Sequence, residues 1–238
     1  MASDSKDSVP VLVVLIVLTL VSGVVDAVSY LGLGHVFVAN MTGNVVLLGI
    51  AAAGAANFSV SATLTSLAAF VVGAVGAGRV AGRIGDRGRL LTAIMIVEAG
   101  LAGTAALIAL LSASTTTGWA RYTDIAILGV AMGMRTGTVR RLGVRDLTTT
   151  VLTQTLAGLA SDSTLAGGDN PLAARRAGAV IAMLAGAAVG AVLVLHVNSA
   201  LPLLVAAALA AGTATAYAAS GAPVRATGTR RGPGRWAG

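Results

Sequence analysis

Two short polar segments contain the residues of this sequence that could bind a small molecule. The first, GHVFVANMTGN at 34–44, contains Asn40, Thr42, Gly43 and Asn44. Asn and Thr favour helix N-caps, and glycine lets a backbone approach closely. A short helix that begins inside a membrane points free N–H groups and partial positive charge from its N-terminus, which suits an anion or a polar neutral group. The alternative is that these side chains only cap a broken helix.

The second segment, RDLTTTVLTQT at 145–155, is richer in hydroxyl groups. Its threonines could simply bond back to helix carbonyls, but their density is high for a lipid-facing segment. The residues expected to bind a solute are Asn40, Thr42, Gly43, Asn44, Asp146, Thr148 and Thr149.

Asp26, Glu98 and Arg135 are charged residues that lie deep within apolar runs. A charge inside a membrane is costly and rarely faces lipid. Arg135 is the candidate cation for Asp26, and Glu98 has no evident partner. Such a pair is either a structural clamp between helices or a proton-linked or substrate-linked switch.

Enzymatic and metal chemistry are not expected. His35 and His196 are far apart, no cysteine is present, and no Gly-Lys-[Ser/Thr] phosphate-binding motif occurs. These absences disfavour a zinc site and an ATP-driven pump. We therefore expect no enzyme, no cofactor and no catalytic or metal-binding residue.

The amino-acid composition indicates the class of fold that positions these segments. Of the 238 residues, 56% are hydrophobic and 11% are charged, and mean hydropathy is +0.88. Soluble domains carry roughly 25% charged residues, so a soluble fold is excluded. The net charge of +7 could suggest nucleic acid, but aromatic side chains for base stacking make up only 3% of the chain. The chain is expected to be a polytopic membrane protein.

Six apolar runs are near the ~20 residues that a membrane-spanning helix needs. They lie at 11–33, 60–82, 90–113, 122–138, 177–197 and 200–219. Two shorter runs, 41–55 and 147–160, would reach only about 21–23 Å as helices. The sequence therefore predicts an all-α membrane protein with six full transmembrane helices and two short half-helices.

The basic residues set the orientation. If the short runs do not cross, fourteen of the 16 Lys and Arg residues lie on one side, with Arg121 opposite and Arg135 within a span. Positive charge accumulates on the cytoplasmic side, so both termini are expected to be cytoplasmic. The expected domains are a cytoplasmic segment at 1–10, a membrane domain at 11–219 and a disordered basic tail at 220–238.

The two halves of the membrane domain resemble each other. A shift of 106 residues places Gly23 on Gly129, Asn40 on Asp146 and Thr42 on Thr148. Each half, about 11–113 and about 122–219, reads as one span, a short helix and two spans. Because three crossings reverse direction, this pattern predicts a 3+3 inverted repeat, which is characteristic of secondary transporters.

Small residues suggest close helix packing. The pairs Gly73/Gly76 and Gly186/Gly190 lie in two of the predicted spans. Glycines at such spacing let helix backbones approach. They are expected to pack helices within the chain, and small-residue faces also offer a contact for a homodimer.

Two stretches resemble a known family. GVVDAVSYLGLGHVFVANMTGNVVLLG at 23–49 and GVAMGMRTGTVRRLGVRDLTTTVLTQTLAGLASD at 129–162 are similar to the two hallmark motifs of the YoaK-type bacterial inner-membrane proteins. The matching positions are Asp26, Asn40, Met41, Thr42, Gly43, Asn44, Arg140, Arg141, Leu142, Gly143, Asp146, Thr148, Thr149 and Thr150. The chain departs from the family at Arg135-Thr136, where Gln-Asn is usual, and at Gln154, where Gly is usual. The resemblance implies a bacterial inner-membrane location and no established substrate.

The leading functional hypothesis is a secondary transporter or channel-like carrier for a small polar or anionic solute. Its site would lie between the N-termini of the two half-helices, and its expected partners are the lipid bilayer and the solute. The alternative is a non-transporting membrane scaffold or accessory subunit. No interaction with nucleic acid is expected.

Overall fold

The computed structural model describes residues 9–112, 118–143, 152–170 and 172–222, and these ranges consist of helices and the segments that connect them, with no strand among them. The helices are α1 (Val9–Gly32), α2 (Met41–Ala52), α3 (Val60–Arg83), α4 (Arg87–Leu111), α5 (Trp119–Leu142), α6 (Leu152–Ser161), the short 3₁₀ helix η2 (Thr164–Ala166), α7 (Ala173–His196) and α8 (Ala200–Ser220). The predicted segments 1–10 and 220–238 lie mostly outside the described residues.

Helix lengths support a polytopic membrane protein. Among the described residues, α1, α3, α4, α7 and α8 are long and apolar enough to cross a membrane. α5 has the same length as α3 and α7, but Arg121, Asp124 and Arg135 make it more polar. α2 and α6, with 12 and 10 residues, are too short to cross ~30 Å of hydrocarbon as straight helices.

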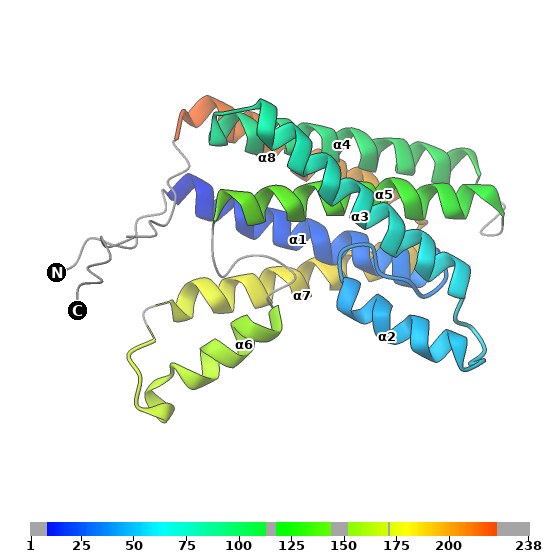
Figure 1. Cartoon of the computed structure of the whole chain (residues 1–238), viewed down its shortest axis with the longest axis horizontal. Coiled ribbons are helices and arrows are strands. Elements are labelled where there is room, and N and C mark those ends of the chain that lie inside the picture. Colours follow the sequence, from blue (N-terminus) through cyan, green and yellow to red (C-terminus); the bar gives the residue numbers. More distant parts are fainter. Residues whose placement is uncertain (1–8, 113–117, 144–151, 171, 223–238) are drawn as a thin grey trace, which may run out of the picture.

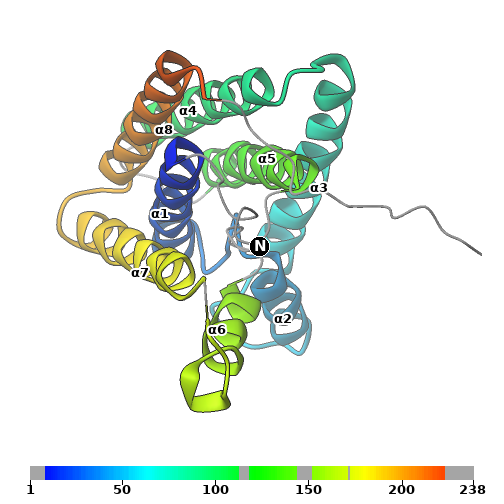
Figure 2. The same cartoon turned by 90° about the vertical axis from the view of Figure 1, so that its left-hand side faces the viewer.

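The long helices form a bundle with α1 and α5 at its centre (Figure 2). α1 packs against α7 and α8, and α5 packs against α3 and α4. α4 and α8 pack against each other and complete the ring around the two central helices. The core side chains are mainly valine, leucine and alanine, including Val24, Val28 and Leu128.

The close contacts of the central helices depend on glycine. A Cβ atom added at Gly73 of α3 would strike the carbonyl oxygen of Val130 in α5. A Cβ atom at Gly186 of α7 would likewise strike the carbonyl oxygen of Leu20 in α1. The packing role predicted for these glycines is confirmed, and only at Gly76, which faces open space, is it wrong.

The two short helices lie on one flank of the bundle, α2 against α3 and α6 against α7. Both begin near the middle of the bundle's long axis and run towards opposite ends (Figure 1). Their first turns therefore lie near the mid-length of the bundle rather than at its ends.

Candidate functional site

The chain between α1 and α2 turns back into the bundle instead of leaving it. We call residues 33–40 the return segment. The Oδ1 atom of Asp26 accepts hydrogen bonds from the backbone N–H groups of Val38 at 3.0 Å and Ala39 at 2.8 Å. Asp26 lies six residues before the end of α1, so the return segment reaches about 9 Å inward along that helix.

Asn44, in the first turn of α2, clamps the same segment. Its Oδ1 atom accepts the N–H of Phe37 at 2.9 Å, and its Nδ2 atom donates to the carbonyl of Phe37 at 2.6 Å. Ser66 of α3 donates to the same carbonyl at 2.6 Å and accepts from Asn44 Nδ2 at 3.1 Å. Asn44 and Ser66 are fully buried, so together they satisfy irregular backbone where no water is available.

The other two polar side chains at the start of α2 are exposed. Asn40 is the N-cap residue, and its side chain accepts the N–H of Gly43 at 3.2 Å. Thr42 is exposed. A Cβ atom at Gly43 would lie 2.8 Å from the ring of Phe37, so the α2 backbone approaches that ring because residue 43 is glycine.

The outer end of the return segment is held by α5. Nε of Arg121 donates to the carbonyl oxygen of Leu33 at 2.7 Å. The next residue, Gly34, has a φ of 95°, and any side chain there would collide with the Arg121 guanidinium. This tight turn at Gly34 directs the chain back towards Asp26.

A buried ion pair joins the two central helices to α4. Nη1 of Arg135 in α5 lies 2.8 Å from Oε1 of Glu98 in α4, and it also donates to the carbonyl of Leu18 in α1 at 2.9 Å. Nη2 of Arg135 donates to the hydroxyl of Ser22. The side chains of Arg135 and Glu98 are 6% and 1% exposed, so the charges compensate each other away from solvent.

The prediction that Arg135 pairs with Asp26 is therefore wrong. Arg135 is paired with Glu98, for which the sequence suggested no partner, and Asp26 instead bonds to backbone N–H groups. The physical reason is that both the arginine and the irregular backbone need a buried partner, and the fold supplies one carboxylate to each.

Several buried polar groups escaped the sequence analysis. Ser22 and Ser66 complete the networks described above, and Asp124 of α5 is 3% exposed. Ser22 could have been found, because it lies one helical turn before Asp26 on the same face of α1. Within the described residues, Oδ2 of Asp26, Oε2 of Glu98 and Oδ1 of Asp124 have no hydrogen-bond partner.

The second predicted segment falls mainly outside the described residues. Asp146, Thr148 and Thr149 precede α6, which begins at Leu152. Of the described polar residues in α6, Thr155 is buried.

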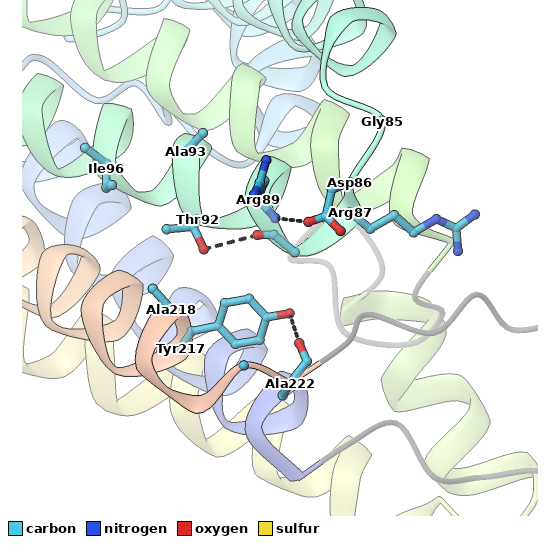
Figure 3. A pocket seen from close by; sticks show the side chains of 12 residues that line it. Gly85, Asp86, Arg87, Arg89, Thr92, Ala93, Ile96, Tyr217, Ala218 and Ala222 are labelled. Atoms are coloured by element: carbon cyan, nitrogen blue, oxygen red, sulfur yellow. Dashed lines mark hydrogen bonds between the residues drawn. The ribbon is translucent and has the colours of Figure 1, made fainter.

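A cavity of about 730 Å³ lies between the first turns of α4 and the last turn of α8 (Figure 3). Asp86, Arg87, Arg89 and Tyr217 contribute to its lining. Asp86 caps α4 by accepting the N–H of Arg89 at 2.6 Å, and the hydroxyl of Tyr217 donates to the carbonyl of Ala222 at 2.8 Å. This cavity is at an end of the bundle and does not include any residue predicted to bind solute.

No group of three or more metal-ligating side chains comes together within the part of the chain that the structure describes. The described polar groups near α2 are amides and hydroxyls, which can hydrogen-bond a polar or anionic solute, and the carboxylate of Asp26, which accepts hydrogen bonds and repels an anion while it is ionised.

Comparison with known proteins places the chain in a family. Residues 14–216 match the family described as "Protein of unknown function (DUF1275)". The chain belongs to that family. A relative of this chain is the "UPF0700 transmembrane protein YoaK" of Bacillus subtilis (strain 168), 35% identical over 147 residues. The alignment covers 61% of this chain and 64% of the relative, so it spans less than two thirds of that protein. No solved structure matches the chain.

The DUF1275 match confirms the family predicted from the two hallmark motifs. The transmembrane relative and the five apolar helices together identify this chain as a membrane protein, in contact with the lipid bilayer.

Proposed function

We propose that this protein is a secondary transporter or channel-like carrier for a small polar or anionic solute. The observation that carries the proposal is the return segment, which brings irregular backbone and the start of α2 inward along α1 to the level of Asp26. Irregular backbone persists at membrane depth only where protein buries it or where it lines a cavity. Discontinuous helices of this kind form the binding sites of many transporters.

The packing of the helices supports a 3+3 inverted repeat. If each helix of α1–α4 is matched with its counterpart in α5–α8, the contact of α3 with α5 corresponds to the contact of α7 with α1. In the same way α4–α5 corresponds to α8–α1 and α2–α3 to α6–α7, and α4–α8 corresponds to itself. In this proposal α5 is the sixth membrane span, and its buried charges are compensated by the fold.

The proposed solute site lies between the first turns of α2 and α6. Asn40, Thr42, Gly43 and Asn44 would contribute from α2, and Asp146, Thr148 and Thr149 from the segment before α6. Asn44 holds the backbone in shape, whereas the exposed Thr42 has a hydroxyl that can contact solute directly. The partial positive charge at a helix N-terminus favours an anion.

Three buried charged residues are candidates for coupling solute movement to protons. Oδ2 of Asp26 and Oε2 of Glu98 have no hydrogen-bond partner among the described residues, so each carboxyl group retains an oxygen that could accept a proton. Arg135 would set which of the two carboxyl groups takes up a proton more readily, since it is bound to Glu98 and to α1.

A thermal-shift screen of the purified protein against small anions, amino acids and nucleobases tests the proposal and identifies the solute class. Compounds that stabilise the protein are then tested for uptake into proteoliposomes. Thr42→Val should weaken both stabilisation and uptake, because it removes a hydroxyl and preserves shape. Thr104→Val is the matched control, since Thr104 is an exposed α4 residue whose hydroxyl bonds its own helix.

If no compound in these classes stabilises the protein, and none enters proteoliposomes that contain it, the carrier proposal fails. A membrane scaffold or accessory subunit would then be the better description. Equal effects of Thr42→Val and Thr104→Val would instead remove the start of α2 from the solute site.

A further inference from the structure

A second surface feature lies between α3 and α5, away from the return segment. This groove has a volume of about 900 Å³ and is open along its length. Its lining residues are Phe70, Val71, Ala74, Val75, Gly78, Arg79, Gly137, Arg140 and Arg141. We call it the arginine groove.

One part of the arginine groove is apolar. Val71 and Val75 lie one turn apart on α3 and are 58% and 47% exposed, so they present a continuous hydrocarbon surface. Gly137 of α5 forms part of the lining without a side chain, and a Cβ atom there would lie 3.0 Å from that of Ala77. The close approach of the two helices thus leaves a shallow apolar channel that runs along α3.

The other part is strongly basic. Arg79 lies one turn before the end of α3, and Arg140 and Arg141 lie in the last turn of α5. All three are exposed, and no acidic side chain lines the groove among the described residues. The guanidinium groups therefore remain available for an anion, and arginine binds phosphate through paired hydrogen bonds.

We propose that the arginine groove is a binding site for an anionic phospholipid. The headgroup phosphate would contact Arg79, Arg140 and Arg141, and an acyl chain would lie along Val71 and Val75. The order of residues along the groove supports a lipid. Its basic residues lie at the helix ends, and its exposed apolar residues follow towards the membrane interior. The headgroup and the acyl chain of a phospholipid are arranged in the same order. Basic pockets between transmembrane helices bind such headgroups elsewhere.

The cavity of Figure 3 gives an internal comparison at the same end of the bundle. α3 ends at Arg83 and α4 begins at Arg87, so the two features share a membrane surface. The cavity contains Arg87 and Arg89, but Asp86 also lines it. An acidic side chain beside the arginines reduces attraction for phosphate, which makes Arg87 and Arg89 suitable control positions.

Native mass spectrometry of the full chain, released from nanodiscs of equal parts phosphatidylglycerol and phosphatidylcholine, tests the proposal. The unmodified protein should retain phosphatidylglycerol in preference to phosphatidylcholine. We expect the double variant Arg140→Gln/Arg141→Gln to lose about tenfold in this preference, because two phosphate contacts are removed. The double variant Arg87→Gln/Arg89→Gln should keep the preference.

A second variant keeps the test informative if the arginine substitutions impair folding. Val71→Trp replaces an exposed side chain, fills the apolar channel and should also lower retention of phosphatidylglycerol. Equal retention by all variants would overturn the proposal. Displacement of the lipid by inorganic phosphate or by glycerophosphoglycerol alone would show a headgroup site without an acyl-chain contact, which also contradicts it. Disulfide crosslinking between two copies of the Val75→Cys variant would identify a contact with a second chain instead of a lipid site, which contradicts the proposal.

Discussion

At the scale of single residues, Asp26 has a structural task that its place in an apolar helix does not reveal. It accepts two backbone hydrogen bonds from the return segment rather than pairing with an arginine. Backbone N–H groups inside a membrane have no water to bind, so an acceptor must come from the protein. A carboxylate suits this purpose because one oxygen can accept more than one hydrogen bond.

Asp26→Asn and Asp26→Ala should differ in stability. Asparagine keeps an Oδ1 acceptor for Val38 and Ala39, whereas alanine leaves both N–H groups without a partner. An unsatisfied buried donor costs about 1–3 kcal/mol, so the alanine variant should lose on the order of 2–4 kcal/mol while the asparagine variant loses less. Unfolding in detergent, followed by circular dichroism, measures the difference.

The comparison also separates structure from coupling. A pH-dependent uptake that disappears in the well-folded Asp26→Asn variant would support proton coupling. Equal destabilisation of the two variants would contradict the role of Asp26 as a backbone anchor.

Arg135 and Glu98 should behave as a unit. Arg135→Gln leaves the Glu98 carboxylate buried without its counter-ion, and breaking a buried pair costs about 3–5 kcal/mol. The double variant Arg135→Gln/Glu98→Gln removes both charges and should recover much of that loss. A double-mutant cycle of unfolding free energies measures the coupling, and a coupling near zero would disprove this account of the pair.

At the scale of helices, the positions of glycine decide which faces meet. α3 shows this within one helix, since Gly73 lies against the backbone of α5 while Gly76 faces open space. The two residues are three apart and look alike in the sequence. Their difference arises because the buried stripe of α3 that contacts α5 runs through Ala69, Gly73 and Ala77, and Gly76 lies outside it.

Gly73→Val should therefore lower the yield of folded protein, and Gly76→Val should not. The new side chain at 73 would collide with the carbonyl of Val130, and a backbone atom cannot rotate away. Overpacking of this kind costs about 1–3 kcal/mol or more. Folded yield on size-exclusion chromatography in detergent compares the two variants, and similar yields would show that the α3–α5 contact is less close than described.

At the scale of the whole molecule, the distribution of charge predicts orientation. Arg79, Arg83, Arg87 and Arg89 surround the turn between α3 and α4. Basic residues remain on the cytoplasmic side, so this end of the bundle should face the cytoplasm with both termini.

The absence of native cysteine makes this orientation directly measurable. A single cysteine at Asn57, between α2 and α3, should react in intact bacteria with a thiol reagent that cannot cross the inner membrane. A cysteine at Gly85, between α3 and α4, should react only after the membrane is opened. Reporter fusions after residues 57 and 118 should likewise indicate the periplasm, and a cytoplasmic signal at either one would rule out the topology.

The sequence by itself determined the class, the family and most of the elements. Spans are predictable because a bilayer demands about 20 apolar residues per helix, and α1, α3, α4, α7 and α8 meet that demand. The short run at 41–55 predicted α2 for a similarly local reason, since capping involves neighbours in the chain, and of the two candidate caps, Asn40 and Thr42, the structure has Asn40. The family followed from two motifs whose residues stand at matching spacing.

Only the tertiary structure decided which polar groups meet. Asp26, Glu98 and Arg135 were recognisable as costly buried charges, but their partners were not. Glu98 and Arg135 lie on different helices, and Asp26 bonds to the return segment, so both contacts depend on how distant parts of the chain pack. The same holds for Ser66, which lies 22 residues from Asn44 in the sequence. Nothing in the sequence of α3 marks this serine, and only the packing of α3 brings it to the carbonyl of Phe37. Local energetics fix where a helix begins and ends, whereas a buried polar contact is fixed by the packing of helices distant in the chain.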